Sequence, residues 1–408
     1  MRRGTVNMTE SPSLEVNRPN APVHTAGSRG VSFHVAIDTK NFALYAGGIA
    51  AFMRPLVSAW LAHRQDVRFS LIGPPFDTAA FASYSNWSHV TVAWPARLPR
   101  PLRHPAYDNL LFPRALRRLA PDFLFSPYHD VRLPAPGDGP RAVMIVHDTC
   151  LDELKAVYPI RVRAYYLAML RLNLRRAAHV ITDSEASRAS ILGRYPLAAG
   201  KISVVYNSAE PAFAEGPPDG AAVAGVRAQY GAARILLYPS GSEHRKNVGR
   251  LLDALELLAA RDGNIVLLAT GHFDPGWARA FAARSPTLKE RVRFLGRLDM
   301  GEIKAHYAAA HAVIYPTLCE GFGRPCLEAM LTGAPIACSD LAVLREVAGD
   351  YAHYFDPYEP RSIAAAILAA MASGRRRPRH DARFELGAVA GRFTALMDRL
   401  LAEVPLHA

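Results

Sequence analysis

Three features are missing from this 408-residue sequence, and each absence excludes a class of protein. No run of about eighteen apolar residues occurs, so we expect no membrane-spanning helix. Residues 1–30 lack the apolar core of a signal peptide, and we expect them to form a flexible tail. No C-x-x-C motif or Cys/His pair occurs, so the sequence predicts neither a zinc site nor a disulfide framework from its cysteines Cys150, Cys319, Cys326 and Cys338. These absences favour the reducing cytoplasm.

The composition that remains is typical of a globular protein with an anionic partner. Half of the residues are hydrophobic and 21% are charged, which allows sizeable cores, and the length predicts two or three domains. The formal net charge is +12. Such a charge favours a nucleotide, a nucleic acid, an acidic glycan or an anionic membrane face as partner, and does not choose among them.

Short apolar runs alternate with helical patterns along most of the chain, which predicts parallel sheets built from βα units. One series of runs begins with VSFHVAID (31–38) and ends with ISVVYN (202–207). A second begins with RILLYPS (234–240) and ends with PIACSD (335–340). The fold class is therefore α/β, with two Rossmann-like doubly wound domains. We expect a first domain over 31–213, a linker rich in Pro, Gly and Ala over 214–232, a second domain over 233–383 and a closing helix over 384–408 that packs back toward the first domain.

The stretch from 312 to 333 combines features of an anion site. AVIYP (312–316) predicts a buried strand, and Pro325 fits the first turn of a helix that ends at Gly333. Between them, Gly321 and Gly323 allow the backbone to approach a ligand, and the helix start offers free N–H groups to an oxyanion. Ligands of such folds bind at this carboxyl edge of the sheet.

Two carboxylates flank this anion site, and a phosphate alone does not explain them. Glu320 lies in the loop and Glu328 lies about one turn into the helix. Carboxylates accept hydrogen bonds well from sugar hydroxyls, so a phosphate between two polyols satisfies both acids. A nucleotide-sugar is such a molecule.

A second strand, loop and helix supply positive charge. Arg245 and Lys246 stand at the entrance of a helix that begins near Asn247, where they can neutralise a diphosphate leaving group. No D-x-D motif occurs, so we expect these cations and the helix dipole to replace a divalent metal, with no metal or cofactor required.

The motifs EGFGRPCLEAM (320–330) and YPSGSEHRKNVGRLLDAL (238–255) resemble those of the family 4 glycosyltransferases, which are retaining enzymes of the GT-B fold. The similarity runs from about Val31 to the end of the chain. It implies two domains that face each other across a cleft. It also implies a nucleoside-diphosphate sugar as co-substrate, transfer of a hexose with retention, and departure of the phosphate on the face that the acceptor approaches. Relatives of this kind often act on mannose in surface polysaccharides, so we lean towards a mannosyltransferase of polysaccharide or lipopolysaccharide biosynthesis that uses a GDP- or UDP-linked donor.

The resemblance also assigns roles to residues of the second domain. Glu320 is expected to contact the transferred sugar as a catalytic residue, and Glu328 to bind the donor ribose. Arg245 and Lys246 are expected to hold the diphosphate. The backbone at Gly321, Phe322 and Gly323 is expected to approach the sugar or phosphates, and the base to lie near Gly296 to Leu298.

In the first domain the resemblance points to two short segments. Gly47 and Gly48 are expected to face the donor, although a tight βα turn explains them equally well. His147, with Asp148, is expected near the acceptor side of the sugar as a second catalytic residue; a satisfied core histidine is the alternative. His129 and Asp130 also end a strand and are weaker candidates.

Two positions depart from the family pattern. Many relatives carry a further basic residue where Ser240 and Gly241 stand here, so phosphate binding is expected to depend more on Arg245 and Lys246. Arg324 stands where an apolar residue is common, and it can either reach the phosphates or face solvent.

Several alternatives remain open at this stage. A GT-B epimerase, a phosphorylase or a non-catalytic nucleotide-sugar-binding protein shares the architecture, and a nucleic-acid binder would explain the charge but not the glutamate and glycine loop. We therefore expect no nucleic acid as partner, and a glycan or lipid-linked glycan as acceptor. Basic segments such as RLPRPLRHP (97–105) and IRVRAYYLAMLRLNLRR (160–176) allow peripheral attachment to the inner face of the cell membrane.

Overall fold

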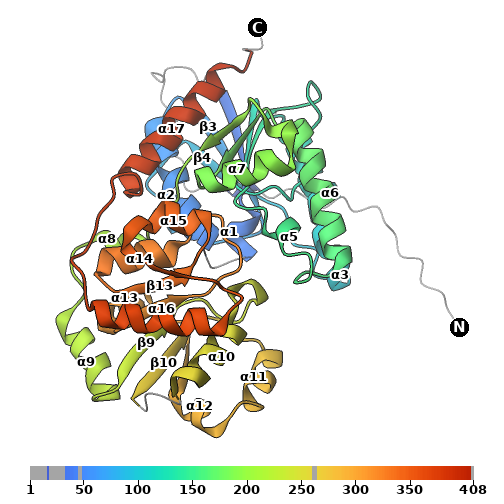
Figure 1. Cartoon of the computed structure of the whole chain (residues 1–408). Coiled ribbons are helices and arrows are strands. Elements are labelled where there is room, and N and C mark those ends of the chain that lie inside the picture. The colour runs from blue at the N-terminus through green and yellow to red at the C-terminus, as the bar shows by residue number, and fades with distance from the viewer. Residues whose placement is uncertain (1–15, 18–32, 45–47, 260–263, 406–408) are drawn as a thin grey trace, which may run out of the picture. The chain divides into compact units, whose positions relative to one another are not determined.

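The computed structural model describes residues 16–17, 33–44, 48–259 and 264–405 (Figure 1). The chain divides into two compact units. The first comprises Met1–Ile145, Leu172–His179 and Thr394–Ala408, and the second comprises Val146–Arg171 and Val180–Phe393. The segment Val146–Arg171 thus groups with the C-terminal half of the chain. The domain borders expected from the sequence stay a prediction.

The first unit contains a parallel sheet with the order β4-β3-β2-β5-β6, and a short β1 pairs antiparallel with β4. The strands are β1 (Val16–Asn17), β2 (Phe33–Asp38), β3 (Val67–Gly73), β4 (Trp87–Thr91), β5 (Phe123–Ser126) and β6 (Arg141–Ile145). The helices are α1 (Lys40–Leu44), α2 (Gly48–His63), η1 (Ala79–Phe81), α3 (Arg100–Ala106), the π-helical η2 (Tyr107–Leu111) and α4 (Phe112–Leu119). Trp60 of α2 packs edge-on against Phe69 and Phe123 of the sheet, with ring centroids 5.1 and 6.2 Å away, because these strands are buried and apolar.

The second unit is built on a six-stranded parallel sheet with the order β11-β10-β9-β12-β13-β14. Its strands are β9 (Arg234–Tyr238), β10 (Ile265–Thr270), β11 (Val292–Gly296), β12 (Ala312–Tyr315), β13 (Ile336–Ser339) and β14 (His353–Phe355). The parallel pair β7 (His179–Thr182) and β8 (Ile202–Val204) comes earlier in the chain. The second series of strands expected from the sequence is therefore confirmed, and β14 is an addition.

Helices cover both faces of the six-stranded sheet, as a doubly wound domain requires. Side chains of each strand alternate between two cores, so that Ile235 and Leu237 of β9 enter one core while Leu236 and Tyr238 enter the other. The first core is closed by α13 (Met300–Ala309), α14 (Arg324–Thr332) and α15 (Ala342–Ala348), and the second by α10 (Val248–Ala259), α12 (Pro286–Arg291) and α16 (Pro360–Ser373). Figure 1 shows α16 and α14 on either side of β13.

The remaining helices of the chain are short or lie at its connections. They are α5 (Cys150–Glu153), α6 (Ile160–Arg176), α7 (Glu185–Arg194), η3 (Pro196–Ala198), α8 (Pro211–Ala214), α9 (Gly220–Tyr230), η4 (His244–Lys246), α11 (Pro275–Ala282), η5 (Gly349–Tyr351) and α17 (Leu386–Ala402). Helix α9 occupies most of the segment interpreted as a linker, and Asp219 caps its first turn. Within the described part of the chain, every helix is too short or too polar to cross a lipid bilayer.

Candidate functional site

The site is organised by two neighbouring strands of the second unit and the helices that follow them. β9 and β12 pair in parallel, so the loops after them meet at one edge of the sheet. Helix α14 begins directly after Gly323, has a proline in its first turn and is terminated by Gly333, as predicted. Gly323 has φ of +102°, and a Cβ there would lie 2.3 Å from Leu344, so only glycine fits.

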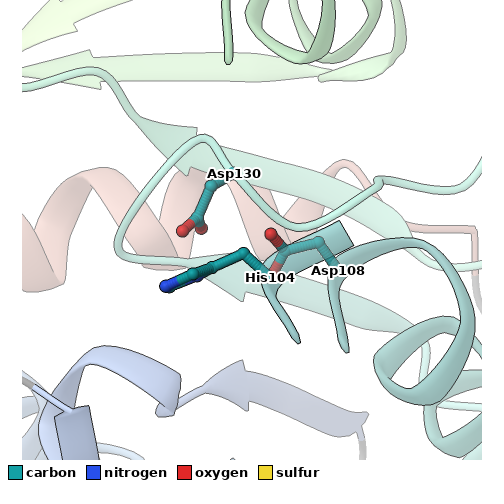
Figure 2. A group of neighbouring side chains, drawn as sticks. All are labelled: His104, Asp108 and Asp130. Atoms are coloured by element: carbon teal, nitrogen blue, oxygen red, sulfur yellow. The ribbon is translucent and has the colours of Figure 1, made fainter. Parts of the chain in front are cut away.

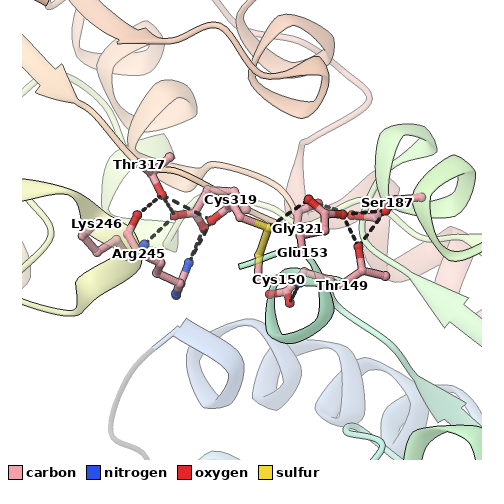
Figure 3. Close-up of a disulfide and its surroundings, with 12 residues drawn as sticks. Thr149, Cys150, Glu153, Ser187, Arg245, Lys246, Thr317, Cys319 and Gly321 are labelled. Carbon is pink, nitrogen blue, oxygen red and sulfur yellow. Dashed lines mark hydrogen bonds and ion pairs between the residues drawn. A yellow bond between two sulfur atoms is a disulfide. The ribbon is translucent and has the colours of Figure 1, made fainter. Parts of the chain in front are cut away.

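Glu320 lies at the centre of a charged cluster. Its carboxylate accepts from Arg245 Nη1 at 2.9 Å and from Lys246 Nζ at 2.7 Å, and Thr317 Oγ1 donates to it at 2.7 Å (Figure 3). Only 9% of its side chain is exposed. Burial pushes the pKa of Glu320 up, but the charges of Arg245 and Lys246 outweigh it and lower the pKa to about 2. Glu320 is therefore an anion at any physiological pH.

Arg245 and Lys246 are held in place by more than this one ion pair. Arg245 Nη1 also donates to the carbonyl of Cys319 at 3.3 Å, and Lys246 Nζ lies 3.3 Å from the Tyr315 hydroxyl. Asn247, the next residue, has φ of +57° and lies between η4 and α10. The helix therefore begins where the sequence predicts, and the two cations point at the loop after β12.

Glu328 has its own partners. Tyr307 Oη donates to it at 2.7 Å, and Arg324 Nη2 lies 3.8 Å away while also pairing with Glu210 at 2.8 Å. Burial raises the pKa of Glu328. Of the two alternatives for Arg324, exposure to solvent does not fit, because its guanidinium is 17% exposed and pairs with two carboxylates. Its contact with the phosphates stays a prediction.

The remaining residues expected around the donor lie at the same edge or contribute backbone only. Phe322 is 3% exposed and packs on Phe384, so only its main chain is available. Gly296 ends β11 with φ of +70°, and the half-buried Leu298 follows it. Gly241 has φ of +67°, and a Cβ there would lie 2.6 Å from the His272 carbonyl oxygen. A side chain at position 241 would therefore clash with the main chain of His272.

His147 follows a strand of the first series, but its main chain contacts the glycine loop, residues 321–323, at Gly321. Its Nδ1 lies 2.8 Å from Asp183 Oδ2, and a Cβ on Gly321 would lie 2.3 Å from its carbonyl oxygen. Ser184 and Ser187 both donate to the Gly321 carbonyl, at 2.8 and 2.9 Å. His147 is therefore oriented by a carboxylate, as a catalytic or a structural histidine would be.

The two glycines expected to face the donor belong to the first unit. Gly47 lies outside the described residues, and Gly48 opens α2. Their predicted contact with a donor stays a prediction.

One expectation about the cysteines is wrong. Cys150 and Cys319 form a disulfide across 169 positions of sequence, with their Cα atoms 5.6 Å apart. Cys326 and Cys338 are free and buried. Spacing along the chain does not reveal such a pair, because the two segments meet only after the fold is complete. The bond ties the turn after His147 to the residue before Glu320.

A separate charged cluster lies in the first unit, at the ends of β2 and β5. Lys40 is buried and donates to Asp108 at 2.6 Å and to Asp130, and His104 lies beside these carboxylates (Figure 2). His104, Asp108 and Asp130 have the ligand atoms of a metal site. However, the Lys40 ammonium already contacts both carboxylates and balances one of their two negative charges. Burial and the neighbouring Asp130 raise the pKa of Asp108 to about 7, so this donor set fits an internal ion pair rather than a divalent cation.

The sequence interpretation missed the residues that orient this site. Thr317, Tyr307 and Asp183 are single polar residues without a motif. In the separate cluster of the first unit, the partners Lys40 and Asp108 are far apart in sequence. Asp183 alone has a sequence signal: in VITDSE it follows an apolar strand, as His147 does.

Two family models match most of the chain. Residues 46–213 match the family model described as Glycosyltransferase Family 4, and residues 226–384 match Glycosyl transferases group 1. Among solved structures, sucrose-phosphate synthase from Thermosynechococcus elongatus superimposes with a TM-score of 0.74 at 19% identity, covering 91% of this chain and 99% of the other. WaaG, a glycosyltransferase involved in lipopolysaccharide biosynthesis, gives 0.64 at 18% identity, covering 89% and 95%.

Curated relatives are similar over shorter lengths. O-antigen chain mannosyltransferase B of Escherichia coli is 29% identical over 67% of this chain and 72% of its own length. O-antigen chain mannosyltransferase RfbU of Salmonella typhimurium is 28% identical over 50% of this chain and 54% of its own. Phosphatidyl-myo-inositol mannosyltransferase of Mycobacterium tuberculosis is 36% identical over 33% of this chain and 35% of its own.

The two Rossmann-like domains with parallel sheets define a protein of the GT-B class. The chain belongs to glycosyltransferase family 4. Its N-terminal half matches the family 4 model, and its C-terminal half matches the group 1 model.

Proposed function

We propose that this glycosyltransferase moves mannose from a nucleoside-diphosphate sugar to a glycan or lipid-linked glycan acceptor, with retention of the anomeric configuration. The observation that carries the proposal is the buried Glu320 carboxylate held between Arg245 and Lys246. An anion beside two cations at the carboxyl edge of a parallel sheet suits a sugar diphosphate, because the cations face the phosphates and the anion faces the sugar.

In the proposed reaction each charged group of the site has a separate task. Arg245 and Lys246 exchange their contact with Glu320 for the diphosphate and stabilise the charge that grows on it as the sugar leaves. Glu320 then faces the positively charged, sugar-like transition state. Glu328 accepts hydrogen bonds from the ribose hydroxyls, and His147 lies on the acceptor side.

We further propose that the reaction needs no divalent metal. Two positive side chains and the amino end of α14 supply the positive field that a magnesium ion gives in other transferases. Addition of EDTA is then expected to leave turnover unchanged, whereas a fall that magnesium or manganese restores would contradict this part of the proposal.

The preference for mannose comes from the named relatives, which are mannosyltransferases of O-antigen and of phosphatidyl-myo-inositol. The base is a separate question, because the HepE structure from Anabaena that resembles this fold holds UDP and glucose. We propose GDP-mannose as the first donor to test, and surface polysaccharide as the pathway.

We also propose that the first unit touches an anionic membrane that carries the acceptor. Leu98, Leu102 and Leu110 are exposed large apolar side chains, and Leu102 and Leu110 are 53% and 52% exposed. They stand among Arg97, Arg100 and Arg103. Exposed leucines between arginines fit the interface of an anionic bilayer.

The deciding experiment offers the purified protein GDP-mannose, UDP-glucose, UDP-galactose and ADP-glucose, and measures donor binding and slow donor hydrolysis. One donor is expected to bind at micromolar concentration and to be hydrolysed slowly with the anomeric configuration of the sugar retained. Lys246→Ala and Glu328→Ala are expected to weaken that binding at least about tenfold, since each removes an interaction with a charged group.

Lys289→Ala and Glu290→Ala are matched controls, because both side chains are exposed on α12 of the same unit. They are expected to bind the donor as the parent does. Equal affinity of all four variants would refute the site. Binding without any hydrolysis or transfer would favour the non-catalytic nucleotide-sugar-binding protein, and conversion of the sugar to its epimer would favour an epimerase.

A further inference from the structure

The disulfide between Cys150 and Cys319 lies within the proposed donor site and joins two of its segments. Cys150 opens α5, three residues after His147, and Cys319 directly precedes Glu320. Figure 3 shows the bond between the Arg245 and Lys246 side of the cluster and the Thr149 and Glu153 side.

The bond fixes the main chain that carries Glu320. The Cys319 carbonyl accepts from Arg245 Nη1 at 3.3 Å, while its Sγ is covalently bound to Cys150. Residue 319 therefore has both its main chain and its side chain constrained. The loop cannot move Glu320 away from Arg245 and Lys246 unless these contacts or the disulfide are released.

Hydrogen bonds also hold the segment around Cys150, at the other end of the disulfide. The Cys150 amide donates to Asp148 Oδ1 at 2.9 Å, and Glu153 of the same short helix accepts from Ser190 Oγ at 2.7 Å and from Thr149 Oγ1 at 2.5 Å. Glu153 Oε2 also lies 3.7 Å from Cys319 Sγ. The covalent tether thus joins two ordered segments rather than a loose end.

In this tethered arrangement Glu320 competes with a diphosphate. Its two oxygens occupy Arg245 and Lys246, the cations that the proposed function assigns to the phosphates. Release of the disulfide allows the 317–323 loop to move Glu320 away from Arg245 and Lys246. Both cations are then free to bind the ligand.

We propose that Cys150 and Cys319 form a redox-controlled site that sets donor affinity, with the disulfide as the weak-binding state and the dithiol as the strong-binding state. The inference rests on the proposed function, because donor binding is its readout. The partner in the exchange is a dithiol reductant. Its two thiols supply two electrons and two protons, the S–S bond breaks, each cysteine gains an S–H, and the reductant closes its own disulfide. A small disulfide oxidant reverses the step.

The reciprocal effect follows from thermodynamic linkage. If reduction raises donor affinity by a certain factor, a saturating donor shifts the dithiol–disulfide equilibrium toward the dithiol by the same factor. We expect about tenfold, within the range typical of coupling between two sites of one protein.

The experiment first counts thiols in the full chain. Alkylation of the unfolded, non-reduced protein is expected to label Cys326 and Cys338 only, and reduction by dithiothreitol to add Cys150 and Cys319. Titration calorimetry with GDP and UDP then compares the oxidised and reduced forms. The better-bound nucleotide is expected to bind about tenfold more tightly to the reduced form.

Cys150→Ser separates the redox effect from other effects of the reductant. It is expected to bind like the reduced parent, with or without dithiothreitol, and its circular dichroism melt shows whether it is folded. Equal affinity of the oxidised and reduced parent would overturn the inference and leave the proposed function intact. If neither form binds GDP or UDP at millimolar concentration, the proposed function itself fails. Four free thiols after treatment with glutathione disulfide would also overturn the inference.

Discussion

At the scale of single residues, the ionisation of Glu320 is the most distinctive property of the site. Its pKa is about 2 in the folded protein against 4.5 for an ordinary glutamate. A lowered carboxyl pKa means that the unfolded chain binds more protons between these values, so stability is fully present above about pH 4.5 and is lost as pH falls toward 2. The shift corresponds to roughly 3 kcal/mol for this buried group.

Lys246→Met tests the cause of that shift. Removing one cation raises the pKa of Glu320, so the loss of unfolding free energy between pH 5 and pH 3 becomes smaller than in the parent, by about 1 kcal/mol. Urea unfolding at the two pH values measures it. Lys289→Met, at an exposed lysine, is expected to keep the parental pH dependence. An unchanged slope in Lys246→Met would show that Arg245 alone holds the carboxylate.

Arg324 is the residue that orients Glu328. Arg324→Met removes the charge shared with Glu210 and Glu328, so the pKa of Glu328, already raised by burial, rises further. A protonated Glu328 accepts ribose hydroxyls poorly. We expect the Kd for the donor nucleotide to rise about fivefold, and more at pH 6 than at pH 8.

Calorimetry at both pH values checks this, with Arg345→Met as the control because Arg345 of α15 pairs with the exposed Asp340, which precedes that helix. A uniform loss at both pH values would mean that Arg324 acts only by packing.

At the scale of elements, the close contact of the glycine loop with the segment after residue 146 is the critical packing feature. A methyl group on Gly321 would lie 2.3 Å from the His147 carbonyl oxygen and 2.9 Å from its carbon. Both are main-chain atoms and cannot rotate away. Gly321→Ala is therefore expected to lower the unfolding free energy by about 2 kcal/mol and to reduce donor affinity.

Gly391→Ala is the matched substitution, because a Cβ at Gly391 meets no atom within 4 Å in the interior of α17. It is expected to raise stability by up to about 1 kcal/mol, the helix propensity difference between the two residues. Denaturant unfolding and calorimetry of both variants give the comparison. A neutral Gly321→Ala would mean that the loop can move away from His147 at little cost.

The sequence predicted these elements better than it predicted their contacts. The glycines and Pro325 that begin and end α14 are local signals, since each serves the backbone of its own neighbours, and the structure confirms them. By contrast, the sequence did not predict helix α9, because its many Gly and Ala residues form no clear apolar stripe. The disulfide and the Lys40 ion pair join segments that are distant in sequence. A single sequence does not show which distant residues meet in the fold.

The same distinction holds within the site. Glu320, Arg245 and Lys246 were predicted from motif positions, and the structure brings them into direct contact. Tyr307 and Thr317, which orient the two glutamates, had no pattern of their own. A hydroxyl that donates one hydrogen bond leaves no trace in composition or spacing.

At the scale of the whole molecule, the net charge of +12 predicts a salt-sensitive attraction to anionic surfaces. The exposed Leu102 and Leu110 add an apolar contact in the first unit. Sedimentation with vesicles that contain anionic phosphatidylglycerol is expected to bring down the protein at low salt. Little should bind in 1 M salt, where the screening length falls to about 3 Å, or to neutral phosphatidylcholine vesicles.

Substitutions separate a docking surface from diffuse attraction. Leu102→Glu together with Leu110→Glu places two negative charges among the arginines and is expected to abolish vesicle binding while leaving donor binding unchanged. Leu257→Glu, at an exposed leucine of α10 in the second unit, is expected to retain most vesicle binding. If both proteins lose binding equally, the attraction comes from total charge. In that case the first unit carries no defined membrane face, and the acceptor must reach the enzyme by another route.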